Sequence, residues 1–150
     1  MSTLVRLLGA VVIALLVGTA TAQTRASDEL LALPEAWHAR YNAGDLDGLA
    51  ALYAPDATAL APDLPPAQGR EAIAAIAQGY LDAGAVRIDV QPSEAYQTGA
   101  DAGWGVGTFE LVSAEGDPVG AGSYLVVYRL QDGVWRIHRH IWNSDLPPAP

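Results

Sequence analysis

Residues 37–58, WHARYNAGDLDGLAALYAPDAT, constrain the fold more than any other part of the chain. Gly44 is the natural end of a helix over 35–42, because glycine adopts the left-handed backbone that stops helices. Asp45 then caps a second short helix. A strand over 56–61 follows. The segment therefore predicts two helices that meet at Gly44 and lead into a strand.

The remaining sequence adds one helix and a run of strands. Ser27 caps an earlier helical stretch, which Pro34 either kinks or restarts. After a proline-rich loop, a third helix ends at Gly84. The hydrophobic period then changes to two, which predicts strands over 86–90, 102–113, 122–130 and 134–143. Helices followed by strands indicate an α+β fold, in which a strongly curved antiparallel sheet wraps around three N-terminal helices.

Residues 1–22 have the three zones of a secretory signal peptide: Arg6, an apolar run over 7–17, and small residues ending at Ala22. The sequence therefore predicts an exported protein, periplasmic or secreted, with cleavage near Ala22. A retained membrane anchor is the open alternative. Residues 23–150 fit a single domain with a short proline-rich tail. We expect this domain to have no contact with the membrane once the signal peptide is cleaved.

The charge of the chain excludes a class of partner. The sequence has 8 basic and 17 acidic residues, and loss of Arg6 leaves 7 minus 17, a formal charge of −10. Such a surface repels phosphate backbones, so we expect no nucleic-acid partner. The glycines at 103, 105 and 107 lie in a strand pattern with no helix after them, so they form no phosphate loop and no cofactor is predicted. The chain has no cysteine, which excludes disulfides and a thiol nucleophile.

Three segments, YNAGDLDGLAALYAPDAT, GREAIAAIAQGYL and VWRIHRHIWNSDLP, resemble the nuclear transport factor 2-like superfamily, and within it the SnoaL-like and ketosteroid-isomerase-like proteins. The resemblance implies a cystatin-like cone whose open end admits a ligand and whose outer sheet face often pairs two subunits. That superfamily includes isomerases, hydrolases, cyclases and subunits without chemistry, so the resemblance implies a fold and not a reaction.

The catalytic positions of the steroid isomerases, a tyrosine and two aspartates, fall on Trp37, Ala61 and about Val126 in this sequence. An indole donates only through its nitrogen, and neither alanine nor valine accepts or donates a proton. Steroid isomerisation by the usual mechanism is therefore not expected.

Alternation along the last strand places His138, His140 and Trp142 on one face. The resemblance turns this face toward the inside of the cone. The same alternation directs Tyr124, Val126 and Tyr128 of the preceding strand inward. The predicted cavity is lined by Trp37, Tyr41, Ala61, Tyr124, Val126, Tyr128, His138, His140 and Trp142.

Two neighbouring imidazoles disfavour each other's protonation, so a neutral His138 or His140 can act as a base near neutral pH. Tyr41 or Tyr128 would polarise an oxygen of the ligand. Two alternatives stay open: both imidazoles are satisfied by tyrosine hydroxyls or sit at a solvated mouth, or the His-x-His pair binds a metal with a further aspartate or glutamate.

Two carboxylates are candidate acids. Asp56 follows the end of a helix, where a structural role is the competing interpretation. Glu110 acts only if its side chain points inward, and the three glycines before it favour a bulge that leaves its direction open.

The opposite face of the last strand carries Trp135, Ile137 and Ile141, an apolar stripe that favours a homodimer through the outer sheet face. The sequence thus predicts an exported pocket protein that binds a small, largely apolar organic molecule. Cofactor-free acid–base catalysis of isomerase, lyase or hydrolase type is one hypothesis. A non-catalytic ligand-binding or protein-interaction module of the same fold is the other.

Overall fold

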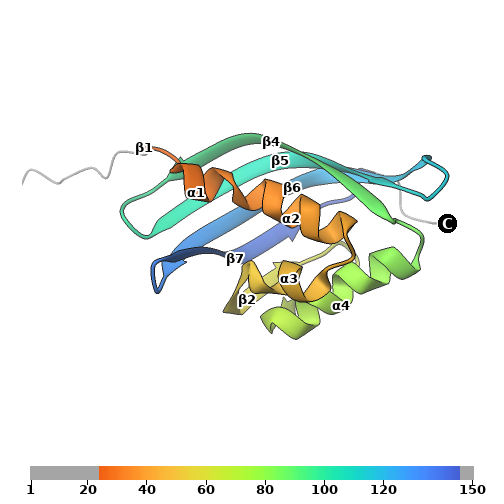
Figure 1. Cartoon of the computed structure of the whole chain (residues 1–150), viewed down its shortest axis with the longest axis horizontal. Coiled ribbons are helices and arrows are strands. Elements are labelled where there is room, and N and C mark those ends of the chain that lie inside the picture. The colour runs from red at the N-terminus through yellow and green to blue at the C-terminus, as the bar shows by residue number, and fades with distance from the viewer. Residues whose placement is uncertain (1–23, 146–150) are drawn as a thin grey trace, which may run out of the picture.

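A computed structural model describes residues 24–145 (Figure 1). The predicted signal peptide and most of the proline-rich tail lie outside these residues. Within them, no helix is both long and apolar enough to cross a membrane. The described helices are α1 (Asp28–Leu31), α2 (Leu33–Asn42), α3 (Leu46–Ala51) and α4 (Gly69–Asp82). The described strands are β1 (Thr24–Arg25), β2 (Tyr53–Leu60), β3 (Ala67–Gln68), β4 (Arg87–Gln97), β5 (Ala102–Val112), β6 (Pro118–Gln131) and β7 (Val134–Trp142).

The helix boundaries follow from their caps. The Ser27 hydroxyl accepts a hydrogen bond from the Leu30 amide and caps the start of α1. Pro34 lies in the first turn of α2, so it restarts the helix. Gly44 has a φ of 66°, which turns the chain between α2 and α3. The Asp45 carboxylate accepts the Gly48 amide at 2.9 Å and caps α3.

The strands form one sheet in the order β1-β4-β5-β6-β7-β2-β3. Strands β4 to β7 make an antiparallel meander, and the expected α+β fold with a curved sheet is confirmed. One pairing differs from the expected antiparallel sheet, because β2 runs parallel to β7. The chain enters β2 directly from α3, beside the start of β7, where the Ile137 amide donates to the Leu52 carbonyl at 2.9 Å.

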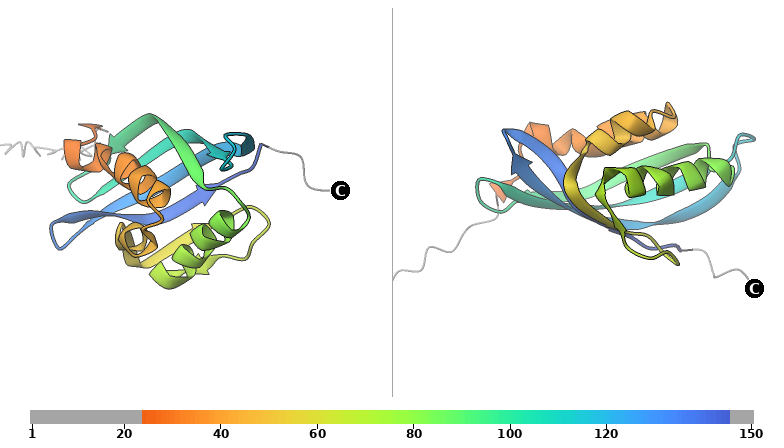
Figure 2. Two further views of the ribbon diagram at one scale, coloured as in Figure 1. Left: turned by 45° about the vertical axis from the view of Figure 1, so that its right-hand side comes forward. Right: turned by 90° about the horizontal axis from the view of Figure 1, so that it is seen from below.

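The helices lie on the concave side of the sheet (Figure 2). Helix α4 packs over β2, and α2 packs against β4. The side chains of Leu30, Tyr41, Leu49, Tyr53 and Tyr128 are fully buried between these layers. The core therefore consists of the inner sheet face and the apolar sides of the helices, as expected for a curved sheet with one covered face.

A β-bulge in β7 changes which residues face inward. Val127 pairs with Arg139, but Tyr128 pairs with Ile137, so His138 is an extra residue on β7. Before the bulge, Trp135 and Ile137 point inward and are only 7% and 3% exposed. The prediction that these two residues form an outer apolar stripe is therefore wrong, because one extra residue reverses the alternation.

The glycines of β5 make room for large side chains and do not form a bulge. Strand β5 pairs with β6 without interruption from Ala102 to Leu111. A Cβ atom on Gly107 would lie 2.6 Å from the Tyr124 hydroxyl and closer still to the Gln91 carbonyl. A Cβ on Gly103 would lie 2.6 Å from the side chain of Leu30. The inner face of β5 is thus kept bare so that aromatic rings of β6 and a leucine of α1 can approach it.

Candidate binding cavity

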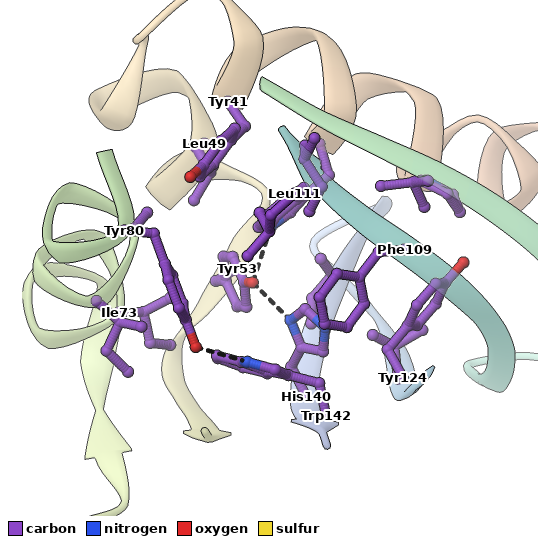
Figure 3. Close-up of a pocket in the computed structure, with 18 of the residues that line it drawn as sticks. Tyr41, Leu49, Tyr53, Ile73, Tyr80, Phe109, Leu111, Tyr124, His140 and Trp142 are labelled. Carbon is purple, nitrogen blue, oxygen red and sulfur yellow. Dashed lines mark hydrogen bonds between the residues drawn. The ribbon is translucent and has the colours of Figure 1, made fainter. Parts of the chain in front are cut away.

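A cavity with about 70 Å³ of free volume lies between the helices and the concave sheet face (Figure 3). Its wall is almost entirely apolar and aromatic. The lining residues are Pro34, Trp37, Tyr41, Leu49, Tyr53, Ile73, Ile76, Ala77, Tyr80, Ile88, Val90, Phe109, Leu111, Tyr124, Val126, Tyr128, Ile137, His140 and Trp142. The wall includes no aspartate, glutamate or arginine among the described residues.

A hydrogen-bonded chain of three side chains crosses this wall. The Trp37 indole N–H donates to the Tyr53 hydroxyl oxygen at 2.9 Å. The same oxygen lies 2.8 Å from Nδ1 of His140, and Figure 3 shows the two side chains pointing toward each other. Residues from α2, β2 and β7 therefore meet at one polar point in an apolar cavity.

His140 is surrounded by aromatic rings. Its ring centroid lies 4.8 Å from Trp142, and the rings of Trp37 and Tyr124 meet it edge-on at 6.2 and 6.1 Å. Burial lowers the pKa of His140 to about 4, because a charged imidazole would lose its hydration there. His140 is therefore neutral near pH 7.

Most of the tyrosine hydroxyls in the wall are occupied or deeply buried. The Tyr41 hydroxyl donates to the Ala85 carbonyl at 2.7 Å, and burial raises its pKa to about 12. Tyr80 accepts the Trp142 indole N–H at 3.1 Å. Burial also raises the pKa of Tyr53 and Tyr128 above the usual value. Tyr41 thus has a structural bond at the atom that was expected to polarise a ligand.

The Tyr124 hydroxyl is the one fully buried side-chain polar atom without a hydrogen-bond partner in the described part of the chain. Burial raises its pKa to about 12. The bare backbone at Gly107 lets the hydroxyl lie against β5. Tyr124 thus contributes an aromatic wall in front of His140, with its polar end turned to the sheet.

Of the residues predicted to line the cavity, the structure brings seven into its wall: Trp37, Tyr41, Tyr124, Val126, Tyr128, His140 and Trp142. Ala61 and His138 do not line it, and the expectation for these two is wrong. Ala61 is buried beyond the end of β2, away from the cavity. His138 is the bulge residue, so it leaves the face that His140 shares with Trp142.

His138 is held outside the cavity by charged neighbours. Its Nε2 lies 3.3 Å from a carboxylate oxygen of Asp56, and the Arg139 guanidinium approaches its Nδ1 at 3.0 Å. The hydrogen bond from His138 is the main reason why the pKa of Asp56 is lowered. Both ring nitrogens of His138 have protein partners and the ring is outside the cavity, so the two imidazoles do not line the cavity together as predicted.

The two candidate acids also lie outside the cavity. The Asp56 side chain is 67% exposed. Glu110 is exposed on the outer face of the sheet, because it alternates with Phe109, which lines the cavity. Residues 24–145 contain no group of three or more histidines, cysteines or carboxylates close enough to hold a metal ion.

Twelve of the 19 lining residues were not predicted to line the cavity, and the aromatic ones among them are Tyr53, Tyr80 and Phe109. Tyr53 lies outside the strand predicted over 56–61, whereas in the structure β2 begins at Tyr53 and this residue joins the cavity wall. Tyr80 belongs to the third predicted helix, none of whose residues was predicted to line the cavity. In the structure Ile73, Ala77 and Tyr80 of this helix lie in the cavity wall.

Known proteins support the family and the fold. Residues 35–140 match the SnoaL-like domain family. A ketosteroid isomerase-like protein from Erwinia carotovora atroseptica SCRI1043 is 23% identical with a TM-score of 0.67, over 81% of this chain and 100% of that chain. A protein of unknown function with a cystatin-like fold from Nostoc punctiforme PCC 73102 is 18% identical with a TM-score of 0.68, over 81% and 96%.

A putative calcium/calmodulin-dependent protein kinase type II association domain from Thiobacillus denitrificans ATCC 25259 is 24% identical with a TM-score of 0.65, over 77% of this chain and 94% of that chain. At these identities the similarity shows the shared fold. None of the curated proteins compared with the chain matches its sequence.

Proposed function

Since the chain belongs to the SnoaL-like domain family, whose fold is typical of pocket proteins that either catalyse reactions or bind ligands, we propose that it binds a small, largely apolar organic molecule in the cavity around His140. The observation that carries this proposal is the composition of the wall. Apolar and aromatic side chains enclose a single neutral imidazole. A concave apolar site with few polar groups is the usual form of a small-molecule site.

The size of the cavity limits the ligand. Its free volume of about 70 Å³ exceeds what one water molecule needs. It is smaller than the roughly 300–1,000 Å³ of sites for drug-sized molecules. The proposed ligand is therefore a compact molecule, of the size of a substituted five- or six-membered ring.

Acid–base catalysis is the second candidate function, because His140 is an imidazole in the wall and could transfer a proton. Binding without turnover ranks above it. The low pKa makes His140 a weak base. The Tyr41 hydroxyl is bonded to Ala85, and neither His138 nor Asp56 reaches the cavity.

Binding is tested by titrating the protein with benzene and following the shifts of methyl and aromatic NMR signals. Benzene is a suitable probe because it enters dry apolar cavities of proteins. We expect saturable shifts confined to the cavity wall. Ala77→Leu should abolish them by filling the cavity, whereas Ala75→Leu, on the exposed side of α4, should preserve them. Saturable shifts that persist unchanged in Ala77→Leu would place the ligand elsewhere and overturn the proposal.

The proposal includes export, on the basis of the signal-like sequence over residues 1–22. The full chain is expressed in a bacterial host, and the periplasmic and membrane fractions are analysed by intact mass. We expect a periplasmic chain that begins at Gln23. A full-length chain held in the membrane fraction would indicate the retained anchor instead.

A further inference from the structure

We infer that Trp37 and Tyr53 fix the proton of His140 on Nε2, so that the cavity selects an uncharged molecule that carries a hydrogen-bond acceptor, such as a ketone, aldehyde or ether. This inference rests on the proposed binding function and names the chemical class of its ligand. Trp37 and Tyr53 are positioning residues, because they act through His140.

The first step concerns the direction of the hydrogen bonds. An indole N–H can only donate, so the Tyr53 oxygen accepts from Trp37. Tyr53 is 1% exposed, and the acceptor within reach of its own hydroxyl proton is Nδ1 of His140, at 2.8 Å. In the opposite arrangement, an Nδ1–H would donate to Tyr53 and leave the buried hydroxyl proton without an acceptor, which is costly. Tyr53 therefore donates to Nδ1.

The second step concerns the other ring nitrogen. A neutral imidazole has one N–H, and with Nδ1 accepting, the proton is on Nε2. Nε2 has no hydrogen-bond partner among residues 24–145. It is also not among the fully buried unpartnered atoms of that part of the chain, which are limited to the Tyr124 hydroxyl. Because His140 lines the cavity, the Nε2–H is available to a molecule inside it.

The third step concerns the ligand. A cation would find no carboxylate in the described wall, and an anion would find no arginine there, so either would lose its hydration without a charged partner. Hydroxyl groups such as that of Tyr128 can both donate and accept, so they do not discriminate between ligands. The fixed imidazole only donates. The wall therefore favours an uncharged ligand with an oxygen or similar acceptor placed at Nε2.

The first experiment compares cyclopentanone with methylenecyclopentane, two molecules of the same shape that differ in the acceptor. Binding of each is measured by NMR titration in the native protein, in His140→Leu and in Tyr96→Phe, a matched control whose hydroxyl lies outside the cavity. We expect His140→Leu to weaken cyclopentanone binding about tenfold. Its effect on methylenecyclopentane should stay within about twofold, and Tyr96→Phe should change neither.

The outcomes separate the two proposals. If methylenecyclopentane binds and His140→Leu affects both molecules equally, the acceptor inference is wrong and the binding function stands. If neither molecule binds the native protein, the binding function fails, and the inference fails with it.

The second experiment reads the tautomer directly and does not depend on a variant. Two-bond proton–nitrogen NMR spectra of the native protein should show His140 with an unprotonated Nδ1 and a protonated Nε2. A protonated Nδ1 would overturn the inference. In Tyr53→Phe no hydroxyl donates to Nδ1, and we expect signals of both tautomers.

Discussion

At the scale of the residue, the buried His140 makes the free energy of unfolding depend on pH. Burial lowers its pKa from 6.5 to about 4 in the folded protein. Between these values the unfolded chain binds a proton that the folded protein does not, so stability falls as pH falls through this window. The expected loss is roughly 3 kcal/mol from about pH 7 to about pH 4.

Urea unfolding at several pH values measures the slope of the unfolding free energy against pH. His140→Gln should remove most of it, because glutamine does not titrate. His38→Gln, outside the cavity on α2, should keep it. A native slope that equals that of His140→Gln would show that His140 is not the residue responsible.

The glycine at position 107 is a second residue whose role is sharply defined. Gly107→Ala places a methyl group against the Gln91 carbonyl and the Tyr124 hydroxyl, and backbone cannot yield easily. We expect a loss of roughly 1–3 kcal/mol in the free energy of unfolding, measured by urea denaturation. Gly79→Ala is the matched control: this glycine is in α4 with no atom near its Cβ position. Alanine should stabilise the protein there by about 0.5–1 kcal/mol.

At the scale of the element, one side-chain hydrogen bond joins α4 to β7 across the cavity, between Tyr80 and Trp142 (Figure 3). Tyr80→Phe removes this bond but keeps the ring. We expect a loss of about 1 kcal/mol and faster hydrogen exchange of the α4 amides, because the helix is less firmly held over the cavity. Gln78→Ala, on the exposed side of the same helix, should change the exchange much less. Equal effects of the two variants would contradict a role for the Tyr80 bond.

The elements show what the sequence can predict. The Gly44 turn, the α4 helix and the strands from β4 to β7 follow from local signals, since glycine, caps and alternation act over a few residues. Pro92 is a local signal of the same kind, because proline has no amide hydrogen for the ladder, and β4 shifts register between Pro92 and Glu94. These features specify the order of the main helices and strands along the chain.

The errors have a long-range cause. The bulge at His138 depends on the pairing of β7 with two neighbours, and the HRH sequence carries no local sign of it. One extra residue moved His138 out of the cavity and turned Trp135 and Ile137 to the inner sheet face, where Ile137 lines the cavity. Similarly, Tyr53 became a site residue because β2 begins before Pro55, with an irregular register between Tyr53 and Thr58. The chain Trp37–Tyr53–His140 therefore could not be assembled from the sequence.

At the scale of the molecule, the homodimer expectation needs a different surface. Ile141 pairs with Leu125 of β6 and with Leu60 of β2, and all three alternate with inward-facing residues. They are 46%, 41% and 39% exposed, so an apolar row crosses three strands on the outer sheet face. We propose that this row, and not Trp135 and Ile137, is the centre of a homodimer interface.

This interface makes two predictions that differ from those of an isolated monomer. Ile141→Glu places a carboxylate at the centre of the row, where its desolvation opposes association, and should weaken the dimer at least tenfold in sedimentation equilibrium. Leu31→Glu adds the same charge at an exposed leucine of α1, on the helical side of the sheet, and should leave the dimer intact. Because two chains of the same strong negative charge repel each other, added salt should tighten the native dimer. A native protein that sediments as a monomer at every salt concentration would refute this interface, and the exposed row would then be ordinary apolar surface of a single chain.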